Sequence, residues 1–279
     1  MIHHYTNLEV LALILKNRTL RFTRLDQVDD PEEGVFVSNG INLGPYTFVS
    51  CWTECEEESI PMWYMYTRKE WGVRLSFEKK GLFKTYIDNV YEINGVKISK
   101  PDGPVVSLFS PEVRWKQKGY TPPIITEDYD ECHFYRIMQY VDDVRPYSAK
   151  SVKELSQQED DMRITIEIDK VGSYKNKRWA FQKGSRFVLF FMPGNIHAFY
   201  NTPHYFQEQK RIIKDVINNK ELGFSYYDMS LSDEAFEHLV ITMSPLCSPA
   251  QRVIVESLCE KYAPKAKVVE SNLLGKVAK

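Results

Sequence analysis

Short runs of apolar and aromatic residues recur along this chain, and they restrict its fold more than any other feature. Several of them alternate with period two, which is typical of β-strands. The run at 71–77 alternates, whereas 186–191 is almost entirely apolar after its arginine, as in a strand buried on both faces. The segment 162–168 also fits the end of a helix. The predicted strands are 2–5, 20–22, 46–52, 71–77, 134–141, 162–168, 186–191, 239–243 and 266–269.

Helical patterns connect some of these strands. Residues 8–15 carry apolar side chains at helical spacing, with Thr6 and Glu9 placed for a capping box and Asn17 as a left-handed stop. A second capping pattern, Ser248-Pro249-Ala250-Gln251, begins a helix near the end of the chain. The other predicted helices are 62–66, the polar segment 148–161, and 205–219.

Strands and helices of this kind, without an internal repeat or a clear linker, predict one α+β domain over residues 1–279. We expect a mixed, largely antiparallel sheet flanked by helices. Prolines interrupt residues 79–130 repeatedly, and this region is predicted to be an insertion. The chain has 17 Tyr, 15 Phe and 5 Trp, which favours a strand-rich core or a stacking pocket.

Charge and cysteine content narrow the class of protein. The 36 Lys and Arg against 38 Asp and Glu give a net charge of −2, so only a local basic patch could bind nucleic acid. No apolar run approaches the roughly 18 residues of a membrane span, and the first residues lack a secretory pattern. The five cysteines lack the spacing of a disulfide framework or a metal site. We therefore expect a cytoplasmic protein without membrane contact or a bound metal.

The chain contains no phosphate loop, dinucleotide-binding glycine motif, zinc-protease motif or nucleophile elbow. A weaker group is His4-Tyr5-Thr6, at the predicted end of a strand and start of a helix. A histidine and a hydroxyl suit a ribose, and a helix N-terminus favours an anion. The alternative is that Thr6 only caps the helix and His4 lies on the surface.

An acidic turn from Asp29 to Glu33 is a second candidate. Its carboxylates, Asp30 and Glu33 in particular, are suited to holding a divalent cation or acting as a general base. The alternative is a solvated loop or a helix start, since Pro31 suits the first helical position.

Aromatic and arginine side chains supply further candidates. Trp63 and Tyr66 suit stacking on a flat ring, or packing in the core. Arg74 and Arg186 lie in apolar strands, where arginine is rarely buried without a partner. Each arginine is expected to face solvent, pair with a carboxylate or bind an anion.

One basic cluster lies between Lys175 and Arg186, and it includes Lys177, Arg178 and Lys183. Aromatic side chains are interleaved with these cations, a mixture that suits a phosphate-bearing nucleotide or a nucleic acid. A solvated basic loop is the alternative.

Several segments also follow one another in the order and spacing of a known family. They are 4–6, 8–15, 20–23, 29–33, 51–53, 62–66, 72–77, 241–262 and 271–273. On these residues the chain resembles the bacterial domain-of-unknown-function 2971 family at both of its ends. The family usually carries a Glu-x-Glu-x-Arg run, of which only Arg186 is present here. Gln182 and Gly184 stand where the two carboxylates would be.

The opening of the chain also resembles the start of ADP-ribosyltransferase folds. This resemblance implies that His4 and Thr6 hold the ribose of NAD and that Trp63 or Tyr66 stacks on nicotinamide. It places Gln182 where ADP-ribosyltransferases have a late Glu that steers the acceptor. A glutamine donates a hydrogen bond but cannot act as a base.

The sequence and its resemblances predict a protein that binds an NAD-like nucleotide and is ADP-ribosyltransferase-like, as an effector in bacterial conflict or phage defence. The candidate catalytic residues are Gln182 and Arg186, with Glu33 or Asp30 as a substitute carboxylate. Two alternatives stay open. One is a metal-dependent nuclease or phosphodiesterase that uses Asp30 and Glu33, and the other is an inactive binding or regulatory module.

Overall fold

The structure is a computed structural model that describes residues 1–88, 91–93, 96–98, 105–117, 119–123, 125, 134–158, 161–199 and 202–277. Cys132 and parts of the predicted insertion at 79–130 lie outside these residues. The described helices are α1 (Leu8–Asn17), α2 (Pro31–Gly34), α3 (Ile60–Tyr66), α4 (Arg145–Ser148), α5 (Tyr205–Ile217) and α6 (Pro249–Tyr262). None of them has the length and apolar character that crossing a bilayer requires.

The described strands form one large mixed sheet and several small ones, so the chain is α+β as predicted. The large sheet is mostly antiparallel, and β20 and β21 form its parallel pair. Its strands run in the order β12-β17-β5-β1-β6-β20-β21, while β2 branches from β5 and carries β19. They are β1 (Ile2–Asn7), β2 (Thr19–Arg24), β5 (Thr47–Thr53), β6 (Gly72–Phe77), β12 (Tyr135–Ile137), β17 (Gly184–Phe190), β19 (Tyr226–Ser230), β20 (Val240–Met243) and β21 (Lys267–Val269).

Two-stranded sheets decorate this framework. They pair β3 (Val37–Ser38) with β4 (Ile41–Asn42), β7 (Tyr86–Asp88) with β10 (Val105–Ser107), β8 (Tyr91–Ile93) with β9 (Val96–Ile98), β11 (Tyr120–Thr121) with β18 (Met192–Pro193), β13 (Gln139–Val141) with β16 (Tyr174–Asn176), and β14 (Val152–Gln158) with β15 (Asp161–Ile166).

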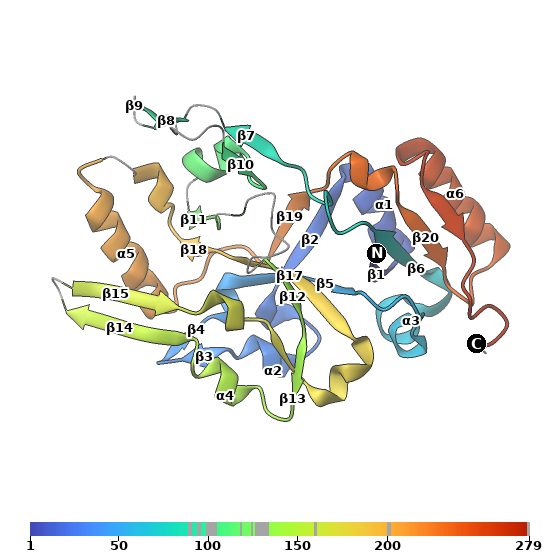
Figure 1. The fold of residues 1–279 in the computed structure, drawn as a ribbon, viewed down its shortest axis with the longest axis horizontal. Coiled ribbons are helices and arrows are strands. Elements are labelled where there is room, and N and C mark those ends of the chain that lie inside the picture. The colour runs from blue at the N-terminus through green and yellow to red at the C-terminus, as the bar shows by residue number, and fades with distance from the viewer. Residues whose placement is uncertain are drawn as a thin grey trace.

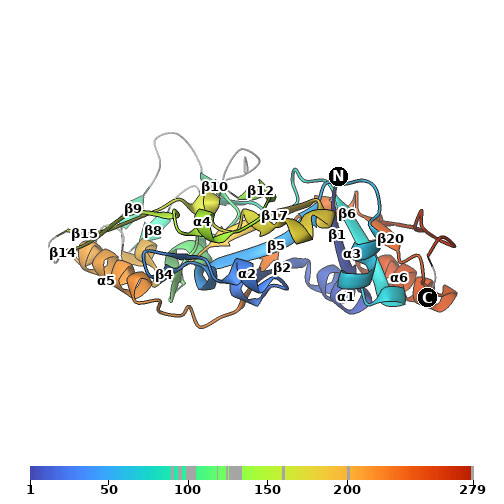
Figure 2. The same ribbon diagram turned by 90° about the horizontal axis from the view of Figure 1, so that it is seen from below.

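The strand β5 organises the large sheet because three strands share its two edges. β17 pairs with it along its whole length on one edge. On the other edge β1 pairs at Thr53 and β2 pairs at Val49 and Phe48, so β1 and β2 diverge from one strand. Figure 1 shows the result, with α1, α3 and α6 gathered around β1, β6 and β20 at one end and α5 with the β14–β15 hairpin at the other. Seen from below, β5 and β17 join the two ends (Figure 2).

Aromatic side chains fill the larger of two hydrophobic clusters. The Phe187 ring is central to it, with centroids of Tyr135, Phe83 and Phe134 at 4.8, 4.9 and 5.0 Å and Trp52 at 6.0 Å. Edge-to-face and tilted aromatic pairs at these separations stabilise the fold by more than the burial of their apolar area alone. Many of the aromatic side chains therefore pack in a strand-rich core, which was one of the two expectations from the aromatic content.

One predicted helix is wrong. Residues 148–161 form a helical turn only up to Ser148, and β14 then begins at Val152. The reason is pairing: β14 runs antiparallel to β15, and Leu155 and Ile164 pack against the smaller hydrophobic cluster. The remaining side chains of β14 are mostly polar, which concealed the strand in the sequence.

Other observed elements differ from the predicted ones by one residue at an end, or are interrupted. Thr6 still pairs with Val73 in the sheet, so α1 is capped by Asn7, whose side chain accepts from the Val10 amide, and not by Thr6. The left-handed stop is Arg18 rather than Asn17. The predicted strand 134–141 is interrupted at residue 138, because β12 pairs with β17 and β13 with β16. The capping box at Ser248 is confirmed. The strand predicted at 162–168 is confirmed over 162–166, where β15 ends, and Ile168 begins a 3-10 turn instead.

Candidate functional site

A cavity of about 90 Å³ lies where β1, β5, β17 and α3 meet. Segments far apart in the sequence supply its walls, and five of the residues singled out from the sequence are among them: His4, Tyr5, Tyr66, Gln182 and Arg186. The other lining residues were not predicted as members of this site, although Asp29 was named in the acidic turn, Lys175 in the basic cluster and Gly184 in the family's acidic run. They are His3, Asp29, Cys51, Trp52, Met62, Met138, Lys175, Gly184 and Ser185.

The helix α3 is held against β1 by two contacts of Tyr5. The Tyr5 hydroxyl accepts from the Ser59 amide at 3.0 Å, just before the helix begins with Pro61 in its first turn. The Tyr5 ring also meets the Trp63 ring edge-on, with centroids 5.0 Å apart. Met62 and Tyr66 are four residues apart and share a helix face, which explains why both line the cavity.

His4 has a defined tautomer. Its Nδ1 atom lies 2.8 Å from the backbone oxygen of Cys51, and a carbonyl oxygen only accepts, so Nδ1 carries the proton. Burial lowers the pKa of the imidazole, although the bond to Cys51 acts in the opposite direction. The ring is therefore neutral at pH 7 and its Nε2 atom is a hydrogen-bond acceptor. Nε2 makes no hydrogen bond to the described residues.

A hydrogen-bonded chain fixes the amide of Gln182. The Tyr66 hydroxyl donates its one hydrogen to the Asp29 carboxylate, so the phenol oxygen must accept from Gln182. The Gln182 Nε2 atom lies 2.5 Å from that oxygen. Burial, together with the neighbouring Asp29 carboxylate, raises the pKa of Tyr66 and keeps the phenol protonated. The Gln182 Oε1 atom is consequently presented as an acceptor.

A group of charged side chains forms one wall of the cavity, with Glu33 behind it. Glu33 is 1% exposed, and its two oxygens lie 3.0 Å from Lys175 Nζ and 2.5 Å from Arg186 Nη1. Arg186 is 2% exposed and also donates to the Gly172 carbonyl at 3.2 Å. Lys175 lies 3.7 Å from an oxygen of Asp29. Two cations and two carboxylates thus balance one another beside the cavity.

Five other residues predicted for the site do not line the cavity. Thr6 is buried in its strand, and Asp30 caps α2 through a 3.0 Å hydrogen bond from the Glu32 amide. Arg74 is 7% exposed, and its Nη1 atom donates to the Glu56 backbone oxygen at 3.0 Å. The acceptor in that hydrogen bond is therefore a backbone carbonyl, not a carboxylate or solvent. The remaining two are Glu33, which lies behind Lys175 and Arg186, and Trp63.

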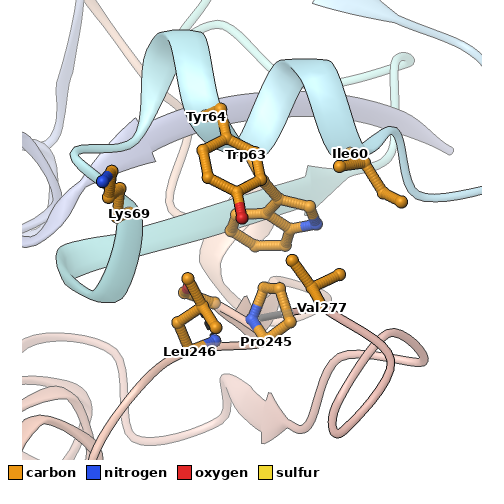
Figure 3. A pocket seen from close by; sticks show the side chains of 8 residues that line it. Ile60, Trp63, Tyr64, Lys69, Pro245, Leu246 and Val277 are labelled. Atoms are coloured by element: carbon orange, nitrogen blue, oxygen red, sulfur yellow. Dashed lines mark hydrogen bonds between the residues drawn. The ribbon is translucent and has the colours of Figure 1, made fainter. Parts of the chain in front are cut away.

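Trp63 does not line the cavity. Figure 3 shows its indole between α3 and the segment of Pro245 and Leu246, where it lines a small apolar hollow. The indole nitrogen donates to Glu58 at 3.0 Å, and the side chain is 2% exposed. This environment is that of a core residue, which was the alternative to ring stacking.

The acidic turn does not gather ligands for a cation. Among the described residues no group of three or more His, Cys, Asp or Glu side chains is placed to hold a metal ion. Glu33 is already paired with Lys175 and Arg186, and two adjacent cations disfavour a divalent metal. Burial, the largest influence, raises the pKa of Asp30.

Most of the basic cluster is neutralised by carboxylates. Lys177 lies 2.8 Å from Asp142, and Arg178 lies 3.8 Å from Glu32. Lys175 and Arg186 are buried in the group described above. Of the cations in this cluster, Lys183 alone has no carboxylate partner in the described part of the chain; its Nζ lies 3.6 Å from the Cys55 sulfur.

No protein-family model, no curated protein and no solved structure matches this chain. The resemblance to the 2971 family and the likeness to ADP-ribosyltransferases therefore stay predictions.

Proposed function

We propose that the cavity binds the ring of an NAD-like nucleotide, with the rest of the nucleotide outside it. The observation that carries this proposal is the convergence of His4, Tyr66, Gln182 and Arg186, four residues from distant segments, on one cavity. The ADP-ribosyltransferase likeness, membership of the 2971 family, the role in bacterial conflict and the cytoplasmic location belong to the same proposal.

The polarity of the cavity supports a ligand that carries N–H donors. Two of its uncommitted polar atoms, His4 Nε2 and Gln182 Oε1, are acceptors, as the hydrogen bonds to Cys51 and Tyr66 require, while Arg186 Nε is an unused donor. Amide groups and exocyclic amines, which nicotinamide and adenine carry, supply such donors. The balanced charges of Lys175, Arg186 and two carboxylates make the cavity a poor place for a phosphate.

The size of the cavity excludes a whole dinucleotide. Sites for drug-sized molecules measure about 300–1,000 Å³, and a cavity of about 150 Å³ accepts benzene. The 90 Å³ found here, with Cys51 exposed beside it, admits one ring at most. The ring would lie among Trp52, Met62 and Tyr66, whose side chains offer apolar surface.

Binding without turnover is the second candidate, and the state of Gln182 favours it. The amide nitrogen of Gln182 is engaged by Tyr66, and an amide has no basic site to activate an acceptor. Release of nicotinamide from NAD, followed chromatographically over hours, separates the two candidates, since a binding module releases none.

The proposal is tested by thermal unfolding with NAD at millimolar concentration. We expect NAD to raise the melting temperature of the wild type, because a ligand that binds only the native state stabilises it, by about 2.7 kcal/mol at 100 times Kd. His4→Ala should lose most of this rise. The matched control, His238→Ala, replaces an exposed histidine that does not line the cavity and should retain the rise. An unchanged melting temperature in the wild type contradicts the proposal.

A further inference from the structure

Cys51 differs from the other cysteines of the described chain in its exposure. Cys55 and Cys247 are half-buried, Cys259 is buried, and Cys51 is exposed on the central strand β5. It is also the cysteine that lines the cavity. Burial raises the pKa values of the Cys247 and Cys259 thiols, which makes these two poor nucleophiles. A reagent that enters the cavity from solvent therefore meets one thiol, that of Cys51.

The neighbour of Cys51 across the sheet is a buried arginine with an unused donor. Cys51 stands directly opposite Arg186 in the pairing of β5 with β17, and side chains in such pairs have Cβ atoms about 4.5–5.5 Å apart. Arg186 spends Nη1 on Glu33 and Gly172, but its Nε atom has no hydrogen-bond partner among the described residues. A buried N–H without an acceptor is costly, and an oxygen placed on the sulfur of Cys51 would supply one.

We propose that Cys51 is an oxidation site for peroxide, and that its sulfenic acid closes the cavity. The ionised sulfur attacks one oxygen of hydrogen peroxide, so an S–O bond forms and the O–O bond breaks. The departing hydroxide takes up the thiol proton and leaves as water. Sulfur is oxidised by two electrons and the peroxide is reduced by two. The new oxygen faces Arg186 Nε, the unused donor, which retains the sulfenic acid.

The consequence for ligands follows from size, and it rests on the proposed function. An added oxygen, hydrogen-bonded to Arg186, takes up part of a cavity of only about 90 Å³. Oxidation should therefore weaken the binding of a ring-bearing nucleotide such as NAD. Reduction by a thiol restores Cys51, because sulfenic acid is a reversible state. The site thus makes nucleotide binding sensitive to peroxide.

The first experiment measures selectivity in the whole chain without any ligand. The protein is treated with hydrogen peroxide and dimedone, which traps sulfenic acids, and each cysteine peptide is quantified by mass spectrometry. We expect Cys51 to be labelled roughly tenfold faster than Cys55, Cys247 or Cys259, as its exposure dictates. Equal or faster labelling of any of these three overturns the proposal.

Two variants test the role of the arginine and the effect on binding. Arg186→Lys keeps a cation beside Glu33 and removes the Nε–H, so the Cys51 sulfenic acid should disappear several-fold faster before dimedone is added; an unchanged lifetime contradicts the role of Arg186. In the second test, peroxide should abolish the NAD-induced rise in melting temperature of the wild type. In Cys51→Ala, peroxide should leave the rise at its untreated size. A rise in the wild type that peroxide leaves intact overturns closure of the cavity. If untreated wild type shows no rise, the proposed function fails while the labelling result stands.

Discussion

Replacement of Glu33 by Gln probes the group of charges on which the cavity wall rests. Glu33 is 1% exposed and receives both Lys175 and Arg186, whose side chains are 3% and 2% exposed. The glutamine has nearly the same shape, so the change removes one charge and little volume. Asp29, 3.7 Å from Lys175 and 39% exposed, is too distant and too solvated to compensate fully. Two buried cations are then left with insufficient negative charge.

The expected cost follows from that imbalance. Breaking a buried ion pair by removing one partner destabilises a protein by about 3–5 kcal/mol. For a chain of this size each kcal/mol lowers the melting temperature by about 2–4 °C. Glu33→Gln should therefore lower the melting temperature by roughly 6–20 °C. Adding Lys175→Met should recover part of this loss, because it removes one of the two uncompensated cations.

The measurement is urea unfolding followed by circular dichroism, with the melting temperature recorded in parallel. The matched control is Glu32→Gln, one residue away: its carboxylate is 48% exposed and 3.8 Å from an exposed arginine, so it should cost less than about 1 kcal/mol. A Glu33→Gln protein within 1 kcal/mol of the wild type would refute the reasoning. So would a loss of equal size in Glu32→Gln.

Two further predictions concern a helix cap and the pH dependence of stability. Ser248→Ala removes the hydroxyl that accepts from the Gln251 amide, so the free energy of unfolding in urea should fall by about 1 kcal/mol, and an unchanged value would mean that the cap contributes nothing. Burial lowers the pKa of His4 below 6.5, the value of an unfolded histidine, so the unfolded state binds more protons than the native state. The contribution of His4 to stability is therefore complete above pH 6.5 and is lost as the pH falls below 6.5. Urea titrations at pH 7 and pH 5 should show a smaller loss on acidification in His4→Gln than in the wild type, and equal losses would contradict this assignment.

Much of the fold could be predicted because local patterns coincided with burial. The run at Arg186 became β17, which is buried at every position, and the capping pattern at Ser248 became the start of α6. The strand β14 was missed because its two covered apolar residues, Val152 and Leu155, are three positions apart across a register shift, so the sequence showed no period-two alternation. The cap moved from Thr6 to Asn7 because sheet pairing extends through Asn7.

The site could be predicted only where a residue's chemistry was unusual for its place in the chain. Arg186 and Arg74 were both singled out as arginines in apolar strands. Only Arg186 lines the cavity, and the residues next to each arginine in the sequence do not reveal this difference. Glu33 was noted for its charge, but its burial between Lys175 and Arg186 is a contact between distant segments. In the sequence Cys51 stood out only as part of the segment 51–53 of the family resemblance. Its exposure could not be predicted, because it depends on the strands that pair with β5.

The most direct test of the central claim is a crystal structure of the protein soaked with NAD. We predict electron density for one ring inside the cavity, with N–H groups within hydrogen-bond distance of His4 Nε2 and Gln182 Oε1, while the phosphates lie outside. Density for NAD at another place on the molecule, or a His4 side chain well separated from Gln182 and Arg186, would contradict the account.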